Sequence, residues 1–183
     1  LAGLALAAGT ALLGHVTPTS LTWRWSIGAT TALCFEFGFC YHHLGANRAE
    51  GGTPFTTVGA ANAVTLVRGG LLAVVAGCLL IDPDPFAPLA WLPAACYGGN
   101  VALDALDGTV ARATDRVTVL GTRLDMAFDT LGFLIAPVVG VLWGQLPVWY
   151  LSLSAARYVF RLGRGLRRFR RFADGLQGLR GGG

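Results

Sequence analysis

The fold is decided by one stretch, residues 104–129, which reads DALDGTVARATDRVTVLGTRLDMAFD. Four of its aspartates, at positions 104, 107, 125 and 129, lie within flanking sequence that is apolar enough for lipid. A carboxylate at membrane depth costs at least about 2.5 kcal/mol. Several of them within so short a span therefore need a compensating cation if the segment is to insert stably.

The spacing of these aspartates predicts two helices that face each other. Asp104 and Asp107 are three residues apart. Asp125 and Asp129 are four residues apart, so each pair shares one face of its helix. We expect a polar turn around residues 114–118 to fold the two helices antiparallel. Facing carboxylates repel one another, and their hard oxygen atoms suit Mg²⁺, Mn²⁺ or Ca²⁺ far better than Zn²⁺. A solvated helix face or a structural ion-pair cluster is the alternative, which the apolar surroundings disfavour.

Small residues lie on the same helix faces as the aspartates. Gly108, Ala111 and Gly121 remove side-chain bulk, so that a backbone or a bulky ligand can come close. Arg112 lies beside the carboxylates and carries a fork of donors suited to phosphate. The stretch therefore predicts a metal site with room for a phosphate-bearing ligand.

The fixed positions follow the pattern Asp-x2-Asp-Gly-x2-Ala-Arg-x8-Gly-x3-Asp-x3-Asp. This pattern resembles the signature of the CDP-alcohol phosphotransferase (CDP-alcohol phosphatidyltransferase) family of integral membrane enzymes. Upstream, Asn62, Thr65 and Arg68 are spaced as Asn-x2-Thr-x2-Arg, which looks like the opening of the family's first core helix. The resemblance runs from about residue 60 to about residue 165.

The resemblance implies a reaction of phospholipid biosynthesis. A CDP-linked lipid, such as CDP-diacylglycerol or an archaeal ether-lipid counterpart, donates a phosphatidyl-type group to a small alcohol acceptor and releases CMP. It implies one or two Mg²⁺ or Mn²⁺ ions bound by the carboxylates of Asp104, Asp107, Asp125 and Asp129. Asp129 is also the expected general base for the acceptor hydroxyl, because a base must keep one oxygen free for the proton.

The resemblance also implies residues that bind the substrates. The expected nucleotide-binding residues are Thr65, Asp104, Gly108, Ala111, Arg112 and Gly121. Asn62 and Arg68 are expected either beside the nucleotide or as contacts that join helices. Arg157 and Arg161 share a face of the last expected helix and suit a phosphate-bearing acceptor such as glycerol phosphate or inositol phosphate. The alternative for this pair is an ion pair with Glu36 or with an aspartate.

Composition agrees with an all-α, polytopic transmembrane helix bundle. The 183 residues are 54% hydrophobic and 13% charged, with a mean hydropathy of +0.57. No strand pattern competes with the helical ones. We expect about six helices, at residues 1–16, 23–43, 57–81, 87–113, 117–143 and from about 148 onward. Trp23 and Trp25 are expected at a membrane interface, as aromatic anchors. No cleavable signal peptide is expected, because the opening lacks a basic start.

Three regions are expected along the chain. Residues 1–56 comprise two N-terminal helices, one short and one spanning, and a cytoplasmic loop. Residues 57–166 form the catalytic transmembrane core. Residues 167–183 form a basic C-terminal tail that lies on anionic headgroups. Binding of nucleic acid is not expected.

The placement of arginine predicts the orientation in the cell membrane. Arg48, Arg116 and the tail arginines of residues 164–171 fall on one side if the six helices alternate. The positive-inside rule makes this side cytoplasmic, which places the carboxylates in the cytoplasmic half of the membrane.

The helix order departs from the family pattern. The family usually has about six core helices, with the motif across the second and third, and forms homodimers. Here the motif falls on the fourth and fifth expected helices. Either the chain stops short of the last two core helices, or the two N-terminal helices take their places. Two other functions stay open: a divalent-cation carrier or sensor, and an inactive homologue that acts as a scaffold.

Overall fold

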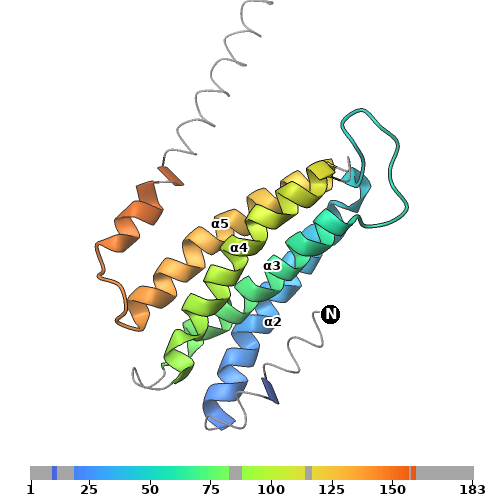
Figure 1. Cartoon of the computed structure of the whole chain (residues 1–183). Helices are drawn as coiled ribbons and strands as arrows, with labels where there is room; N and C mark the ends of the chain where they lie inside the picture. The colour runs from blue at the N-terminus through green and yellow to red at the C-terminus, as the bar shows by residue number, and fades with distance from the viewer. Residues whose placement is uncertain (1–9, 12–18, 83–87, 114–116, 157, 160–183) are drawn as a thin grey trace, which may run out of the picture. The chain divides into compact units, whose positions relative to one another are not determined.

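The computed structural model describes residues 10–11, 19–82, 88–113, 117–156 and 158–159 (Figure 1). Near the C-terminal end of one helix the description covers the backbone alone, at residues 107, 108, 110, 111 and 112. The chain forms two compact units, residues 1–146 and 147–183. The region boundaries predicted after residues 56 and 166 stay predictions.

The described residues are mostly helical and contain no strand. The long helices of the first unit are α2 (Thr19–His42), α3 (Ala60–Gly77), α4 (Leu92–Ala113) and α5 (Val119–Leu142). Short 3-10 turns lie at Leu44–Ala46, Cys78–Leu80 and Pro88–Trp91. In the second unit, residues 150–156 are helical. The all-α prediction is confirmed.

Within the described part of the chain, the helix count is lower than the six expected. Four long α-helices and one shorter helical segment are described, and the first expected helix falls almost wholly outside the described residues. The ends of the four long helices lie within a few residues of the predicted ones. The largest difference is at α4, where residues 88–91 form a 3-10 turn before the α-helix begins at Leu92.

Among the described residues, two segments are long and apolar enough to cross a membrane, Ala60–Leu80 and Val119–Leu142, with mean hydropathies of 2.1 and 1.6. Large apolar side chains also point outward from the bundle, including those of Trp23, Phe35 and Leu134. Extended exposed apolar surface is unfavourable in water and favourable against lipid tails. The fold is therefore an all-α membrane bundle, as the composition predicts.

Helix α3 lies at the centre of the first unit and packs against α2, α4 and α5 (Figure 1). Its small residues permit this close packing. A Cβ atom at Gly77 would lie only 2.5 Å from the indole Nε1 of Trp25 on α2. That indole donates a hydrogen bond to the carbonyl of Val74 at 3.2 Å. Trp25 is therefore buried between helices, whereas Trp23 is exposed, and their placement at the membrane interface stays a prediction.

Two apolar clusters hold the four helices together. The first contains Trp25, Val75 and Trp143, and the Trp143 indole closes it by donating to the carbonyls of Cys78 and Ile81 at 3.1 and 3.0 Å. The second cluster is formed by Cys40, Leu72, Leu120, Leu124 and Phe128. Because Leu124 and Phe128 each directly precede an aspartate of the motif, this packing fixes the side of α5 on which the aspartates emerge.

Candidate functional site

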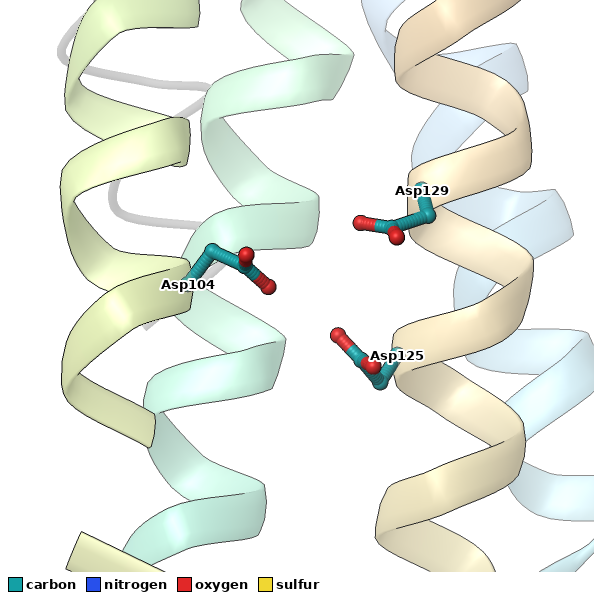
Figure 2. A group of neighbouring side chains, drawn as sticks. All are labelled: Asp104, Asp125 and Asp129. Atoms are coloured by element: carbon teal, nitrogen blue, oxygen red, sulfur yellow. The ribbon is translucent and has the colours of Figure 1, made fainter. Parts of the chain in front are cut away.

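Three aspartates from two helices converge beside α3. Figure 2 shows Asp104 on α4 pointing toward Asp125 and Asp129 on α5. One carboxylate oxygen from each residue can be chosen so that all three lie within 4.8 Å of one another. The side chains are 46%, 44% and 34% exposed, in the order 104, 125, 129, so a ligand can reach them. The structure thus brings together three of the four predicted carboxylates.

The guanidinium of Arg68 on α3 lies among these carboxylates. Its Nη2 atom is 2.7 Å from Oδ1 of Asp104 and 3.0 Å from Oδ1 of Asp129. Its Nη1 atom is 2.6 Å from Oδ1 of Asp125. Its Nε atom donates to Oδ1 of Asn100 at 3.4 Å. Only 1% of this arginine side chain is exposed. Of the two roles that the sequence left open for Arg68, its burial therefore favours a contact that joins helices over a contact with the nucleotide.

The donor set fits a divalent cation. Three carboxylates and one guanidinium leave two negative charges, which one divalent ion balances. Mg²⁺ binds oxygen at about 2.0–2.1 Å, so oxygens on opposite sides of it lie about 4.2 Å apart. The observed spread of 4.8 Å needs only a small closure. Oxygen donors of this kind hold Mg²⁺ or Mn²⁺ in preference to Zn²⁺.

A family model for CDP-alcohol phosphatidyltransferase matches residues 58–171, which is more than half of the chain and includes the whole site. The chain belongs to the CDP-alcohol phosphatidyltransferase family. Members transfer a phosphatidyl group from a CDP-alcohol to a second alcohol, and they generally depend on divalent metal. No curated protein and no solved structure matches the chain.

Several motif residues of the family lie in α4 where only the backbone is described. They are Asp107, Gly108, Ala111 and Arg112, which are helical as predicted. Their side-chain roles stay predictions. Arg157 and Arg161 lie outside the described residues, so neither acceptor binding nor a pairing with Glu36 is tested.

Asn62 joins three parts of the bundle at the end nearest the carboxylates. Its Nδ2 atom donates to Oδ1 of Asn47 at 3.2 Å, and its Oδ1 atom accepts from Oγ1 of Thr118 at 3.1 Å. Asn47 in turn donates to the carbonyls of Phe55 and Thr57 at 3.2 and 3.1 Å. Asn62 therefore ties the loop after α2 to the starts of α3 and α5, in agreement with the helix-joining alternative.

Gly121 belongs to the same junction. A Cβ atom at this position would lie 2.5 Å from Oδ1 of Asn62, so the glycine allows α5 to approach α3. The close approach of the two helices thus explains by packing why a glycine suits position 121. The expected place of Gly121 beside the nucleotide stays a prediction. Thr65, one turn further along α3, is buried and donates to the carbonyl of Ala61 at 3.1 Å.

Two buried polar residues near the site were not assigned a role from sequence. Asn100 lies four residues before Asp104. The helical spacing that pairs the aspartates therefore also predicts that Asn100 shares a face of α4 with Asp104, one turn earlier. Glu36 on α2 is 3% exposed, and its Oε1 atom has no hydrogen-bond partner in the described part of the chain.

Thr118 is the N-cap of α5, and its replacement tests the junction. Its hydroxyl accepts from the backbone N–H of Gly121 at 2.9 Å while donating to Asn62. We expect Thr118→Val, which keeps the shape but loses both bonds, to lower the free energy of unfolding by about 1–2 kcal/mol. Thr118→Ser is expected to stay close to the wild type. Thermal unfolding of the full chain in detergent measures both, and equal losses in the two variants would contradict the capping role.

Proposed function

We propose that the protein is a metal-dependent CDP-alcohol phosphotransferase that moves a phosphatidyl-type group from a CDP-linked lipid to a small alcohol. The observation that carries this proposal is the convergence of Asp104, Asp125 and Asp129 from two neighbouring helices. Family membership supplies the reaction class. The product CMP leaves, and the lipid product enters phospholipid biosynthesis.

Asp104, Asp125 and Asp129, with Asp107 as the fourth member of the motif, would hold one or two Mg²⁺ or Mn²⁺ ions. When bound, such ions hold the diphosphate and stabilise the charge that develops on the departing CMP. The chain offers no nucleophile of its own in this proposal. The acceptor oxygen forms a bond to the phosphorus that carries the lipid alcohol, and the bond from that phosphorus to the bridging oxygen breaks. CMP leaves with this electron pair.

Asp129 would take the proton of the acceptor hydroxyl. It has the least exposed side chain of the three carboxylates, yet about a third of it remains accessible to a substrate. Direct displacement needs only such a base, bound metal and correct positioning of the two substrates. Positioning is assigned to the nucleotide-binding residues Thr65, Asp104, Gly108, Ala111, Arg112 and Gly121, and on the acceptor side to Arg157 and Arg161.

The site would open to the cytoplasm. The backbone N–H of Val119, the first residue of α5, donates to the carbonyl of Arg48 at 2.9 Å. The arginine-bearing loop therefore lies at the same end of the bundle as the start of α5, and Asp125 follows within two turns. With the positive-inside rule, this supports a carboxylate site in the cytoplasmic half of the cell membrane, within reach of soluble acceptors and of lipid from the side. A homodimer is expected from the family resemblance.

The experiment that tests the proposal measures CMP release by the purified full chain in lipid nanodiscs. Labelled CDP-diacylglycerol is supplied with glycerol phosphate or inositol phosphate, with Mn²⁺, Mg²⁺ or excess chelator. We expect CMP release that requires both metal and one of the acceptors. In a parallel vesicle assay, metal-ion flux without CMP release would support a carrier. Metal binding with neither flux nor CMP release, for every donor and acceptor tried, would support an inactive scaffold.

A further inference from the structure

The most buried charge in the site is the cation, not the carboxylates. Arg68 is 1% exposed, whereas each of its three carboxylate partners keeps at least a third of its side chain exposed. A guanidinium stays protonated in proteins, so this positive charge is permanent. A permanent buried charge needs partners, because an unpaired one is far more costly than a paired one. Arg68 and the aspartates therefore stabilise one another.

The guanidinium of Arg68 also reduces the repulsion among the three carboxylates. Asp104, Asp125 and Asp129 approach within 4.8 Å of one another, so their negative charges repel strongly when nothing lies between them. A guanidinium is planar and carries several donors in a fixed fork, so it can contact several carboxylates at once. Arg68 does so through two nitrogen atoms. Arg68 therefore provides a positive charge that belongs to the chain itself and partly balances the carboxylates.

Arg68 and a bound metal ion would compete for the same carboxylate oxygens. The nitrogen-to-oxygen distances are 2.6–3.0 Å, whereas Mg²⁺ draws oxygen to about 2.0–2.1 Å. These three contacts go to an Oδ1 atom of each carboxylate, so they engage oxygens that a metal ion would also need. A metal ion bound there attracts the same lone pairs and repels the guanidinium. Asn100 on α4 accepts from Nε and gives the arginine a further contact that is not a carboxylate.

We propose that Arg68 is a resident counter-cation of the carboxylate site, which holds the site together without metal and competes with metal for the same oxygens. The inference rests on the proposed metal centre and adds a property to it. Arg68 lowers the affinity for metal alone, so that tight metal binding requires the further oxygen ligands of a diphosphate. Its role is positioning: it acts through the aspartates. A merely structural arginine would not oppose metal binding.

The test is a Mn²⁺ titration of the full chain in nanodiscs without nucleotide, with free Mn²⁺ read by electron paramagnetic resonance. The variants are Arg68→Gln and Arg68→Lys. Arg24→Gln on the exposed surface of α2 is the matched control for loss of one arginine charge. Because close charge pairs commonly couple by more than a factor of ten, we expect Arg68→Gln to bind Mn²⁺ at least about tenfold more tightly than the wild type. Arg68→Lys keeps the charge but not the fork and is expected to bind with intermediate affinity.

Thermal unfolding provides the second measurement. In chelator, Arg68→Gln is expected to unfold at a lower temperature than the wild type, and saturating Mn²⁺ is expected to raise its midpoint more than that of the wild type. If Arg68→Lys, and Arg68→Gln where it folds, bound Mn²⁺ no more tightly than the wild type, the inference about Arg68 would be overturned while the proposed metal centre would stand. A wild-type chain that binds no Mn²⁺ would overturn the metal centre and this inference with it.

Discussion

Replacing Asp129 by asparagine is expected to lower metal-dependent CMP release by about a thousandfold, the usual worth of a positioned general base. Asparagine has nearly the same shape but cannot take a proton from the acceptor hydroxyl. The variant is expected to lose no more than a few-fold in Mn²⁺ affinity, because Asp129, as the base, keeps one oxygen free for the proton and so contributes less to metal binding than Asp104 and Asp125. Single-turnover CMP release and Mn²⁺ titration, on the same preparation, measure the two effects.

Asp125→Asn is the matched comparison, since it makes the same chemical change one turn earlier on α5. Asp125 contacts Nη1 of Arg68 at 2.6 Å, and the proposal assigns it to the metal alone, with no role as base. We expect this variant to lose activity together with Mn²⁺ affinity, the latter by a factor of at least about ten. High Mn²⁺ concentration should restore part of its activity and none of that of Asp129→Asn. Equal losses of metal affinity in both variants would contradict a separate role for Asp129 as base.

The meeting of the aspartates could be predicted from sequence because it depends on local periodicity. Spacings of three and four residues fix the face of a helix, and one polar turn between two helices fixes their antiparallel order. The structure accordingly places Asp104 opposite Asp125 and Asp129. The approximate ends of the helices were also predictable from local sequence, because long apolar segments and polar breaks alternate along the chain.

The central position of Arg68 could not be predicted in this way. It meets Asp104 and Asp125 across 36 and 57 positions of sequence, and such partners are set by how three helices pack. The spacing of residues 62–68 identified the helix but not which of its polar side chains faces α4 and α5. Trp25 shows the same limit. Helix α2 is apolar on all sides, so its sequence does not reveal which tryptophan is buried against α3.

Gly69→Ala is expected to disrupt both the packing and the site, although it adds a single methyl group. The new Cβ atom would lie 2.7 Å from Oε2 of Glu36 and 2.9 and 3.0 Å from two ring carbons of Phe128. The Glu36 side chain can rotate away, but the Phe128 ring is enclosed by the second apolar cluster and cannot move without shifting α5. We expect a loss of about 1–3 kcal/mol of stability from overpacking. A shift of Asp129, which follows Phe128, is expected to lower CMP release by about a hundredfold.

The neighbouring glycine supplies the control. A Cβ atom at Gly70 would have no atom within 4 Å, so Gly70→Ala adds the same group to the same helix without a clash. We expect it to leave CMP release unchanged and to raise stability by up to about 1 kcal/mol, because alanine favours the helix. A second variant, Gly69→Ala with Phe128→Leu, removes the ring that blocks the new methyl group and should recover part of the lost activity. If Gly69→Ala retained full activity, or if the double variant recovered none, the Phe128 ring would not be what connects α3 to the position of Asp129.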